Sequence, residues 1–271
     1  MVGNPNQRRV FWTTEAVLGL VAGLVFVWIA DGRLADIYGL SPWNSADFID
    51  YCSGLLHMSG EDAPWPIKRS KFAGLIPLGL KPSYGLVGAF RAGALVSTFL
   101  VGAGLYAWGR VLAGRAAGLM AVVAALGFAP IVRLPRMLNY YPEATAFFVI
   151  GAAMFSAGLM HPKRRGLAWA GAGIGLALCA DVRGLVWAVP WTAAALWAIG
   201  WGGENRKSAA KAFVLPLILF FFVGRWAYPA DTASFESQLV ATDFLRTTAA
   251  SLMFFSTSSD FPTAENMRPS M

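Results

Sequence analysis

Carboxylates and cations gather in one long polar interval of the chain, residues 31–85. It contains Asp47 and Asp50, followed by the basic pair Lys68 and Arg69. A carboxylate can take a proton from an acceptor hydroxyl or amine when its surroundings tune its pKa. Cations on the same loop are suited to hold a phosphate. These residues predict a site for an anionic substrate, with Asp47 and Asp50 as candidate bases.

Further ionisable residues stand near the ends of apolar runs that follow this interval. They are Arg91, Arg133, Arg136, Glu143 and Arg183. Ionisable groups at membrane depth cost several kcal/mol and persist mainly where they line a cavity or pair with one another. Guanidinium groups bind phosphate through a fixed fork of donors. A second interpretation stays open, in which the arginines extend to lipid headgroups and the aspartates solvate a surface helix.

The elements that must position these residues are membrane helices. The chain is 56% hydrophobic and only 14% charged, which exceeds the usual apolar content of about half. A helix needs about 20 apolar residues to cross a bilayer, and lipid cannot satisfy an irregular backbone. We therefore expect an all-α polytopic membrane protein with about seven spans, at residues 10–30, 86–108, 111–131, 141–160, 166–180, 185–200 and 209–228.

The distribution of charge predicts the orientation. A cytoplasmic N-terminus leaves 31–85 outside as a large first loop with short amphipathic helices, and 230–271 as an outer-face tail. The transmembrane module then covers 1–229. Such a chain suits a bacterial inner membrane with its active face outside. The segments that would lie inside are rich in basic residues, as the positive-inside rule requires: Arg8, Arg9, Arg110, Arg115, Lys163, Arg164, Arg165, Arg206, Lys207 and Lys211.

Composition also argues against several other classes. The 22 Lys and Arg exceed the 15 acids but do not cluster on a polar face, so no nucleic-acid partner is expected. Cys52 and Cys179 give neither a disulfide framework nor a metal-ligand spacing. His57 has no partner at ligand spacing. We predict no metal site and no cofactor, and leave a requirement for a divalent ion open.

Several short motifs follow one another in a characteristic order. An acidic run with a nearby Tyr lies in the first loop, a basic segment precedes the second span, and an Arg opens that span. A proline-containing outer turn with Arg follows the third span, and an acid opens the fourth. The segments are Asp47-Phe-Ile-Asp-Tyr51, Lys68 to Pro77, Arg91-Ala-Gly-Ala-Leu, Pro130-Ile-Val-Arg133 and Asn139-Tyr-Tyr-Pro-Glu143.

This order resembles the C-type (GT-C) membrane glycosyltransferases, which include the protein mannosyltransferases and the aminoarabinose transferases. The likeness covers about residues 10–228. Two details depart from the family pattern: Glu143 stands where Asp is commoner, and the first-loop acids are spaced rather than adjacent. Family members usually continue with further spans, so the resemblance is to their N-terminal module.

The resemblance implies transfer of a sugar from a polyprenyl-phosphate donor to an outer-face acceptor, with inversion at the anomeric carbon. The acceptor would be a lipid, a glycan or a protein. Asp47 would be the base, and Asp50, Tyr51 and Glu143 would support it. The donor phosphate would lie among basic residues, and the implied partners are the lipid-linked sugar, membrane lipids and a further subunit. The implied phosphate ligands are Arg91, Arg133, Arg136, Arg183, Lys68 and Arg69.

Two other functions remain open at this point. A non-catalytic scaffold subunit, or a degenerate transferase, would keep the fold without the activity, because fold alone does not fix function. A transporter would also place ionisable residues at membrane depth. However, transporters commonly show an internal repeat and paired half-helices, and neither is visible in this sequence.

Overall fold

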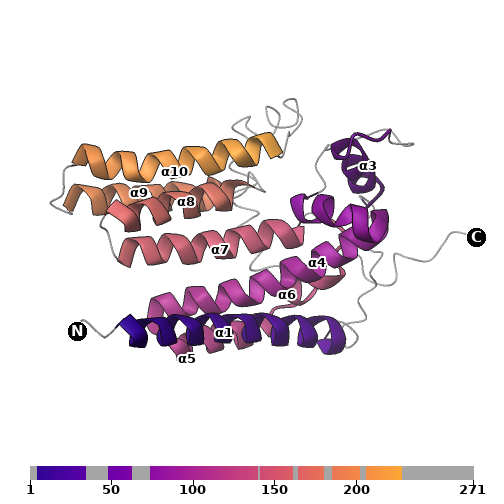
Figure 1. Ribbon diagram of the computed structural model, residues 1–271, viewed down its shortest axis with the longest axis horizontal. Coiled ribbons are helices and arrows are strands. Elements are labelled where there is room, and N and C mark those ends of the chain that lie inside the picture. The colour runs from indigo at the N-terminus through magenta and orange to yellow at the C-terminus, as the bar shows by residue number, and fades with distance from the viewer. Residues whose placement is uncertain are drawn as a thin grey trace, which may run out of the picture. The chain divides into compact units, whose positions relative to one another are not determined.

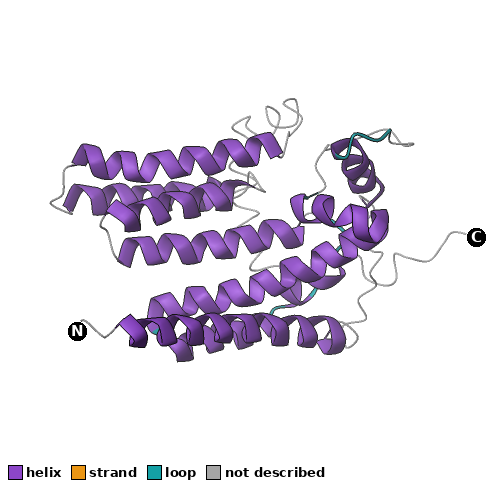
Figure 2. Ribbon diagram, in the orientation of Figure 1, coloured by secondary structure: helices purple, strands orange, loops and turns teal. Residues whose placement is uncertain are grey.

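A computed structural model of the chain describes residues 5–34, 48–62, 74–139, 141–160, 164–179, 185–201 and 206–227. Throughout these ranges the chain forms helices joined by loops, without strands (Figure 2). The predicted all-helical fold is confirmed for this part of the chain. Two compact units divide the chain, Met1–Asp231 and Thr232–Met271. All described residues belong to the first, so the predicted tail 230–271 lies outside the description.

The longest helices lie beside one another in chain order. α4 contacts α1 and α7, α7 contacts α8, and α8 contacts α10 (Figure 1). α5 packs against α4, and α9 lies against α8 and α10. The elements are α1 (Pro5–Ile29), the π-helix η1 (Ala30–Leu34), α3 (Phe48–Met58), α4 (Leu75–Ala113), α5 (Arg115–Leu126), α6 (Ala129–Val132), the 3₁₀ helix η2 (Leu134–Arg136), α7 (Tyr141–Met160), α8 (Arg164–Cys179), α9 (Leu185–Trp201) and α10 (Arg206–Ala227).

Three helical segments in the described ranges are long and apolar enough to cross a membrane. They are Thr13–Gly32, Leu75–Ala113 and Tyr141–Met160. A fourth span results if Arg115–Leu126 and Ala129–Arg136, which meet at an angle of 84°, count as one. α8 and α9 have 16 and 17 residues, fewer than the roughly 20 that a span needs. The seven-span topology therefore stays a prediction.

α4 is bent sharply at Gly85. This residue has φ 67° and ψ −174°, a conformation essentially reserved for glycine. The residues before the bend turn back on those after it, and a Cβ added at Gly93 would lie 2.9 Å from the Pro77 ring. The last part of the predicted first loop is thus a short helix folded against the span that follows it.

Glycines allow the later helices to approach closely. A Cβ at Gly151 of α7 would lie 2.4 Å from the carbonyl oxygen of Gly173 in α8. A Cβ at Gly171 of α8 would lie 2.0 Å from the carbonyl oxygen of Phe213 in α10. Small residues at such crossings bring backbones into van der Waals contact. Side chains larger than glycine would separate these three helices.

α3 covers the bend of α4. Its buried residues Tyr51, Cys52 and Leu55 pack against Phe90 of α4 and Leu138, which follows η2. Ser53 and Gly54 between them are buried as well, so this turn of α3 is enclosed. Burial raises the pKa of the Cys52 thiol to about 11. Through these apolar contacts α3 packs against Phe90, the residue of α4 that precedes Arg91.

Candidate functional site

Two arginines of the predicted site, Arg91 and Arg136, meet at Asp31. This residue lies in η1, where α1 ends, and its carboxylate accepts hydrogen bonds from Arg91 of α4. Nη2 of Arg91 is 2.7 Å from Oδ1 and 2.8 Å from Oδ2. Nη1 of the same side chain donates to the carbonyl oxygen of Pro135 in η2. Arg91 therefore links the end of α1 to the turn before α7.

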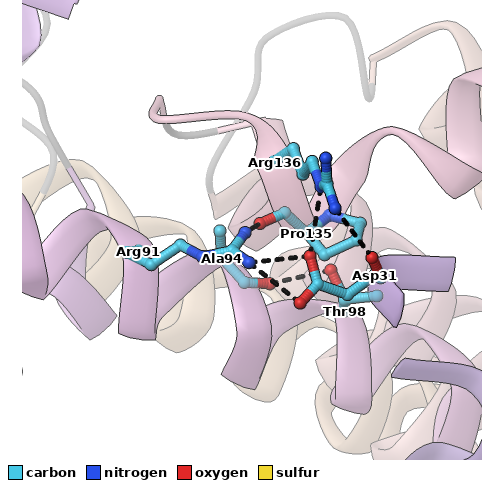
Figure 3. A network of polar contacts seen from close by, with 6 residues as sticks. All are labelled: Asp31, Arg91, Ala94, Thr98, Pro135 and Arg136. Carbon is cyan, nitrogen blue, oxygen red and sulfur yellow. Dashed lines mark hydrogen bonds and ion pairs between the residues drawn. The ribbon is translucent and has the colours of Figure 1, made fainter. Parts of the chain in front are cut away.

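Arg136 joins the same carboxylate from η2. Its Nε is 3.4 Å from Oδ1 of Asp31, and its Nη2 donates to the backbone oxygen of Asp31 at 3.0 Å. Figure 3 shows the two guanidinium groups reaching Asp31 from different sides. Arg136 reaches Asp31 from a sharp turn. This turn is the 3₁₀ helix η2, which begins directly after Arg133 and contains Pro135. We call Asp31, Arg91 and Arg136 the outer cluster, after the membrane face that the sequence predicts for them.

The outer cluster joins two guanidinium groups to a single carboxylate. Two guanidinium groups and one carboxylate leave a net charge of +1, and all three side chains are partly exposed. The bonds to Asp31 and Pro135 number three, whereas a guanidinium has five N–H donors. The Nε–H and one Nη1–H of Arg91 therefore have no acceptor among the described residues. These groups are available to an anionic oxygen.

An open apolar groove adjoins the outer cluster. It runs between α1 and α4, has a volume of about 550 Å³ and includes Asp31 in its lining. We call it the α1–α4 groove. It combines a hydrocarbon-like wall with a charged end, as a site for an amphipathic anion would. Its other lining residues are Leu24, Val27, Trp28, Gly32, Leu95, Val96 and Phe99.

Glu143 lies in the first turn of α7, against the start of α4. Its side chain is buried, and its two carboxylate oxygens accept hydrogen bonds from the backbone N–H groups of Leu75, at 2.9 Å, and Ile76, at 3.1 Å. These are N–H groups of the first turn of α4, which have no partner within their own helix. Glu143 thus holds the start of α4 against α7, and the partial positive charge of the helix end favours the carboxylate.

The other predicted site residues are only partly described. Arg133 is half-buried between α6 and η2, and Tyr51 is a buried residue of α3. The backbone of Asp50 belongs to α3, and its side chain lies outside what the structure describes. The remaining four predicted residues lie outside the described ranges. They are Asp47, Lys68, Arg69 and Arg183.

Two further acids, Asp31 and Glu15, were not among the predicted site residues. Asp31 directly follows an apolar run, which is a signal for a charged residue at membrane depth. Glu15 lies near the start of the apolar segment Thr13–Gly32 and accepts hydrogen bonds from Tyr106, Arg110 and Arg115, at 3.0, 2.9 and 2.6 Å. Each acid therefore joins α1 to basic residues far along the chain.

The arrangement is suited to bind an anion, and no other ligand set is evident in the described ranges. There, no three His, Cys, Asp or Glu side chains come close enough to hold a metal ion. The outer cluster instead offers fixed guanidinium donors beside an apolar surface. Comparison of the chain with family models, with curated proteins and with solved structures found no match.

Proposed function

We propose that this chain is a membrane glycosyltransferase that moves a sugar from a polyprenyl-phosphate donor to an acceptor on the outer face of the membrane. One observation carries the proposal: Asp31 and Pro135 hold Arg91, two N–H donors of Arg91 have no acceptor among the described residues, and Asp31 lies at the end of an apolar groove. A lipid-linked phosphate needs both features. The guanidinium would bind the phosphate, and the apolar surface would receive the lipid.

The reaction gives the arginines a defined role. An acceptor hydroxyl or amine attacks the anomeric carbon, the bond from that carbon to the phosphate oxygen breaks, and polyprenyl phosphate leaves with the electron pair. Negative charge thus develops on the phosphate, and donors fixed in advance stabilise it most effectively. Because Asp31 orients Arg91, little side-chain entropy has to be lost when the donor binds.

Asp31 is better suited to position the arginines than to act as the base. Both of its carboxylate oxygens already accept hydrogen bonds from Arg91. The proton of the acceptor would then pass to a carboxylate of the first loop, as the sequence predicts for Asp47 or Asp50. Asp50 lies in α3, which packs against α4 close to Arg91 in sequence. Asp31 is therefore a positioning residue in this mechanism.

The positions of Glu15 and Asp31 support the proposed orientation. Glu15 and Asp31 are 16 residues apart, which corresponds to about 24 Å along a helix and approaches the roughly 30 Å of a hydrocarbon core. The Glu15 end gathers Arg110 and Arg115, which the positive-inside rule favours on the cytoplasmic side. The outer cluster then faces outward, which for a bacterial inner membrane means the periplasm.

A scaffold function is the second candidate, and the same ion pairs favour it. Asp31 neutralises part of the charge of Arg91 and Arg136 and ties η1, α4 and η2 together. Networks of this kind also occur where they serve only to hold helices in place. A scaffold would tolerate any change that preserves the fold, whereas a transferase would not.

A transfer assay in proteoliposomes separates the two candidates. The full chain is reconstituted with a labelled polyprenyl-phosphate sugar and a crude envelope acceptor, with and without Mg²⁺. Wild type is compared with Asp47→Asn, Asp50→Asn and Arg91→Gln. The transferase proposal expects donor consumption by wild type and its loss in Arg91→Gln and in one of the Asn variants. Absence of donor consumption by folded wild type across the donors and acceptors tried would reject it in favour of the scaffold.

A further inference from the structure

We propose that α3 and the first segment of α4, residues 75–84, form a hinged cap that opens and closes over the rest of α4. We call these two elements the outer cap. The motion itself does not depend on the proposed function. Its role in sugar transfer rests on that function, and the motion and the role have separate measurements.

A glycine stands at each end of residues 75–84. Gly74 has a φ of 117° and Gly85 a φ of 67°, a region that glycine enters at little cost. Hinges of moving elements are a few such positions, at which the backbone angles absorb the change of direction. A Cβ added at Gly85 would meet no atom of the described residues within 4 Å. The segment can therefore swing as a unit without a change in its own helix.

One carboxylate fastens the segment to the bundle. Glu143 of α7 accepts hydrogen bonds from the backbone N–H groups of Leu75 and Ile76, at 2.9 and 3.1 Å. One turn further on, the Pro77 ring lies against α4, because a Cβ added at Gly93 would be 2.9 Å from it. Glu143 thus provides a polar clasp beside an apolar seat. A change of its side chain releases the clasp and leaves the seat intact.

Other contacts tie the two elements of the outer cap to each other. Lys81 of the segment pairs with Glu61, which follows α3. Leu78 and Leu80 of the segment pack against the apolar cluster that contains the buried Cys52 of α3 (Figure 1). These contacts lie within the cap, so they are the same whether it is closed or open. Cys52 is therefore a built-in reporter, which a reagent reaches only when the cap opens.

The outer cap carries a candidate base and borders the outer cluster. The backbone of Asp50 belongs to α3, and α3 packs on Phe90, directly before Arg91. Closure of the cap therefore sets the separation between this candidate base and the guanidinium of Arg91. Lids of enzymes complete a site and exclude water in the same way. Under the proposed function, the open cap admits the acceptor and the closed cap completes the site.

Release of the clasp tests the motion. The full chain in detergent, with Cys179→Ser, is compared with the same chain carrying Glu143→Gln, at one pH. Alkylation of Cys52 and amide hydrogen exchange both report the open fraction. In Glu143→Gln, both should accelerate together by about tenfold, at Cys52 and at residues 75–84, as a loss of about 1.4 kcal/mol from the closed state would give. The buried α7 residues Val149 and Phe155 should keep their exchange rates.

Two variants serve as matched controls. Thr145→Ala changes α7 close to Glu143, at a hydroxyl that donates within its own helix. Lys81→Gln removes an ion pair within the cap, which does not shift the balance between closed and open. Both variants should leave the alkylation of Cys52 near the wild-type rate.

A disulfide across the apolar seat tests the closed state directly. The 2.9 Å between a Cβ at Gly93 and Cγ of Pro77 places the two Cβ atoms within about 4.5 Å, the separation that a disulfide spans. Pro77→Cys and Gly93→Cys are combined in a chain without Cys52 and Cys179. Oxidation should slow amide exchange in α3 about tenfold, and dithiothreitol should restore it. Each single-cysteine variant should show no response to the oxidant.

Several results would overturn the hinged cap. Equal acceleration at Cys52 and Val149 in Glu143→Gln would show that the carboxylate supports the whole bundle. Acceleration at Leu75 and Ile76 alone would show that only the first turn frays. Unchanged exchange of α3 after oxidation of the paired cysteines would show that α3 does not move with the segment.

Sugar transfer by the oxidised pair variant tests the role of the motion. We expect transfer in proteoliposomes to be lost on oxidation and to return with dithiothreitol. Transfer at the wild-type rate in the oxidised variant would reject this role and leave the transferase standing. Opening of the cap in a wild type that transfers no sugar would uphold the cap and reject the transferase.

Discussion

Arg91 of α4 donates from one nitrogen, Nη2, to both carboxylate oxygens of Asp31, at 2.7 and 2.8 Å, across 60 residues of sequence. Arg136 adds a longer contact to the same carboxylate at 3.4 Å. The strength of this pairing can be measured with a double-mutant cycle of Asp31→Asn and Arg91→Gln. Because both side chains are partly exposed, we expect a coupling free energy of about 0.5–1.5 kcal/mol. Additive effects on unfolding in detergent would show that the pair contributes nothing to stability.

Replacing Glu143 should loosen the start of α4. Glu143→Ala leaves the N–H groups of Leu75 and Ile76 without their acceptor, which should cost about 2–4 kcal/mol. Glu143→Gln keeps one carbonyl acceptor and should cost about half as much. Amide hydrogen exchange at Leu75 and Ile76, together with the melting temperature, provides the measurement.

A neighbouring residue of α7 supplies the control for Glu143. The hydroxyl of Thr145 donates to the backbone oxygen of Tyr141 in its own helix, so Thr145→Ala should change stability by less than about 1 kcal/mol. If Glu143→Ala proved no more disruptive than Thr145→Ala, the carboxylate would not be what holds α4.

Two glycine substitutions test the bend in α4. Gly85→Ala forces a side chain into a backbone with φ 67°, which should cost about 1–3 kcal/mol. Gly79→Ala, in the helix just before the bend, meets open space and should stabilise by about 0.5–1 kcal/mol. Opposite signs in thermal unfolding are the expected result. Equal stability of the two variants would mean that the bend at Gly85 is not part of the folded protein.

The Cys52 thiol should react slowly. In a Cys179→Ser background, a thiol pKa of about 11 leaves about a thousandth of the thiol ionised at pH 8. Alkylation should therefore accelerate about tenfold for each pH unit and level off only above about pH 11. Because the folded pKa lies above the unfolded one, the thiol also lowers stability progressively from about pH 9 to pH 11. A plateau near pH 9 would indicate an exposed thiol.

The sequence predicted helices well and their ends less well. Apolar runs indicated α1 and α7 because a bilayer demands long apolar helices. The start of α4 at Leu75 was missed, since it depends on the backbone of Gly85 and on the carboxylate of Glu143. Neither the φ angle of a glycine nor the partner of an acid far along the chain can be read from hydrophobic periodicity.

The sequence indicated two arginines that the structure brings together, but not the acid between them. Arg91 and Arg136 were expected on one membrane face, and the structure brings both to Asp31. Asp31 itself was overlooked because its partners lie 60 and 105 residues away. The supporting role predicted for Glu143 stays a prediction, and its contacts with the backbone of Leu75 and Ile76 were not foreseen. Charge patterns indicate where ionisable residues gather, whereas pairing depends on tertiary packing.

The most direct test of the account is donor turnover by Arg91→Gln in proteoliposomes, with Lys81→Gln as the matched control. Lys81 is a cation of the same helix that pairs with Glu61. Removing a charged donor to the phosphate should lower kcat/KM about 10- to 100-fold, while Lys81→Gln should leave it near the wild-type value. Equal turnover by folded Arg91→Gln and wild type would contradict the central claim that Arg91 binds the donor phosphate.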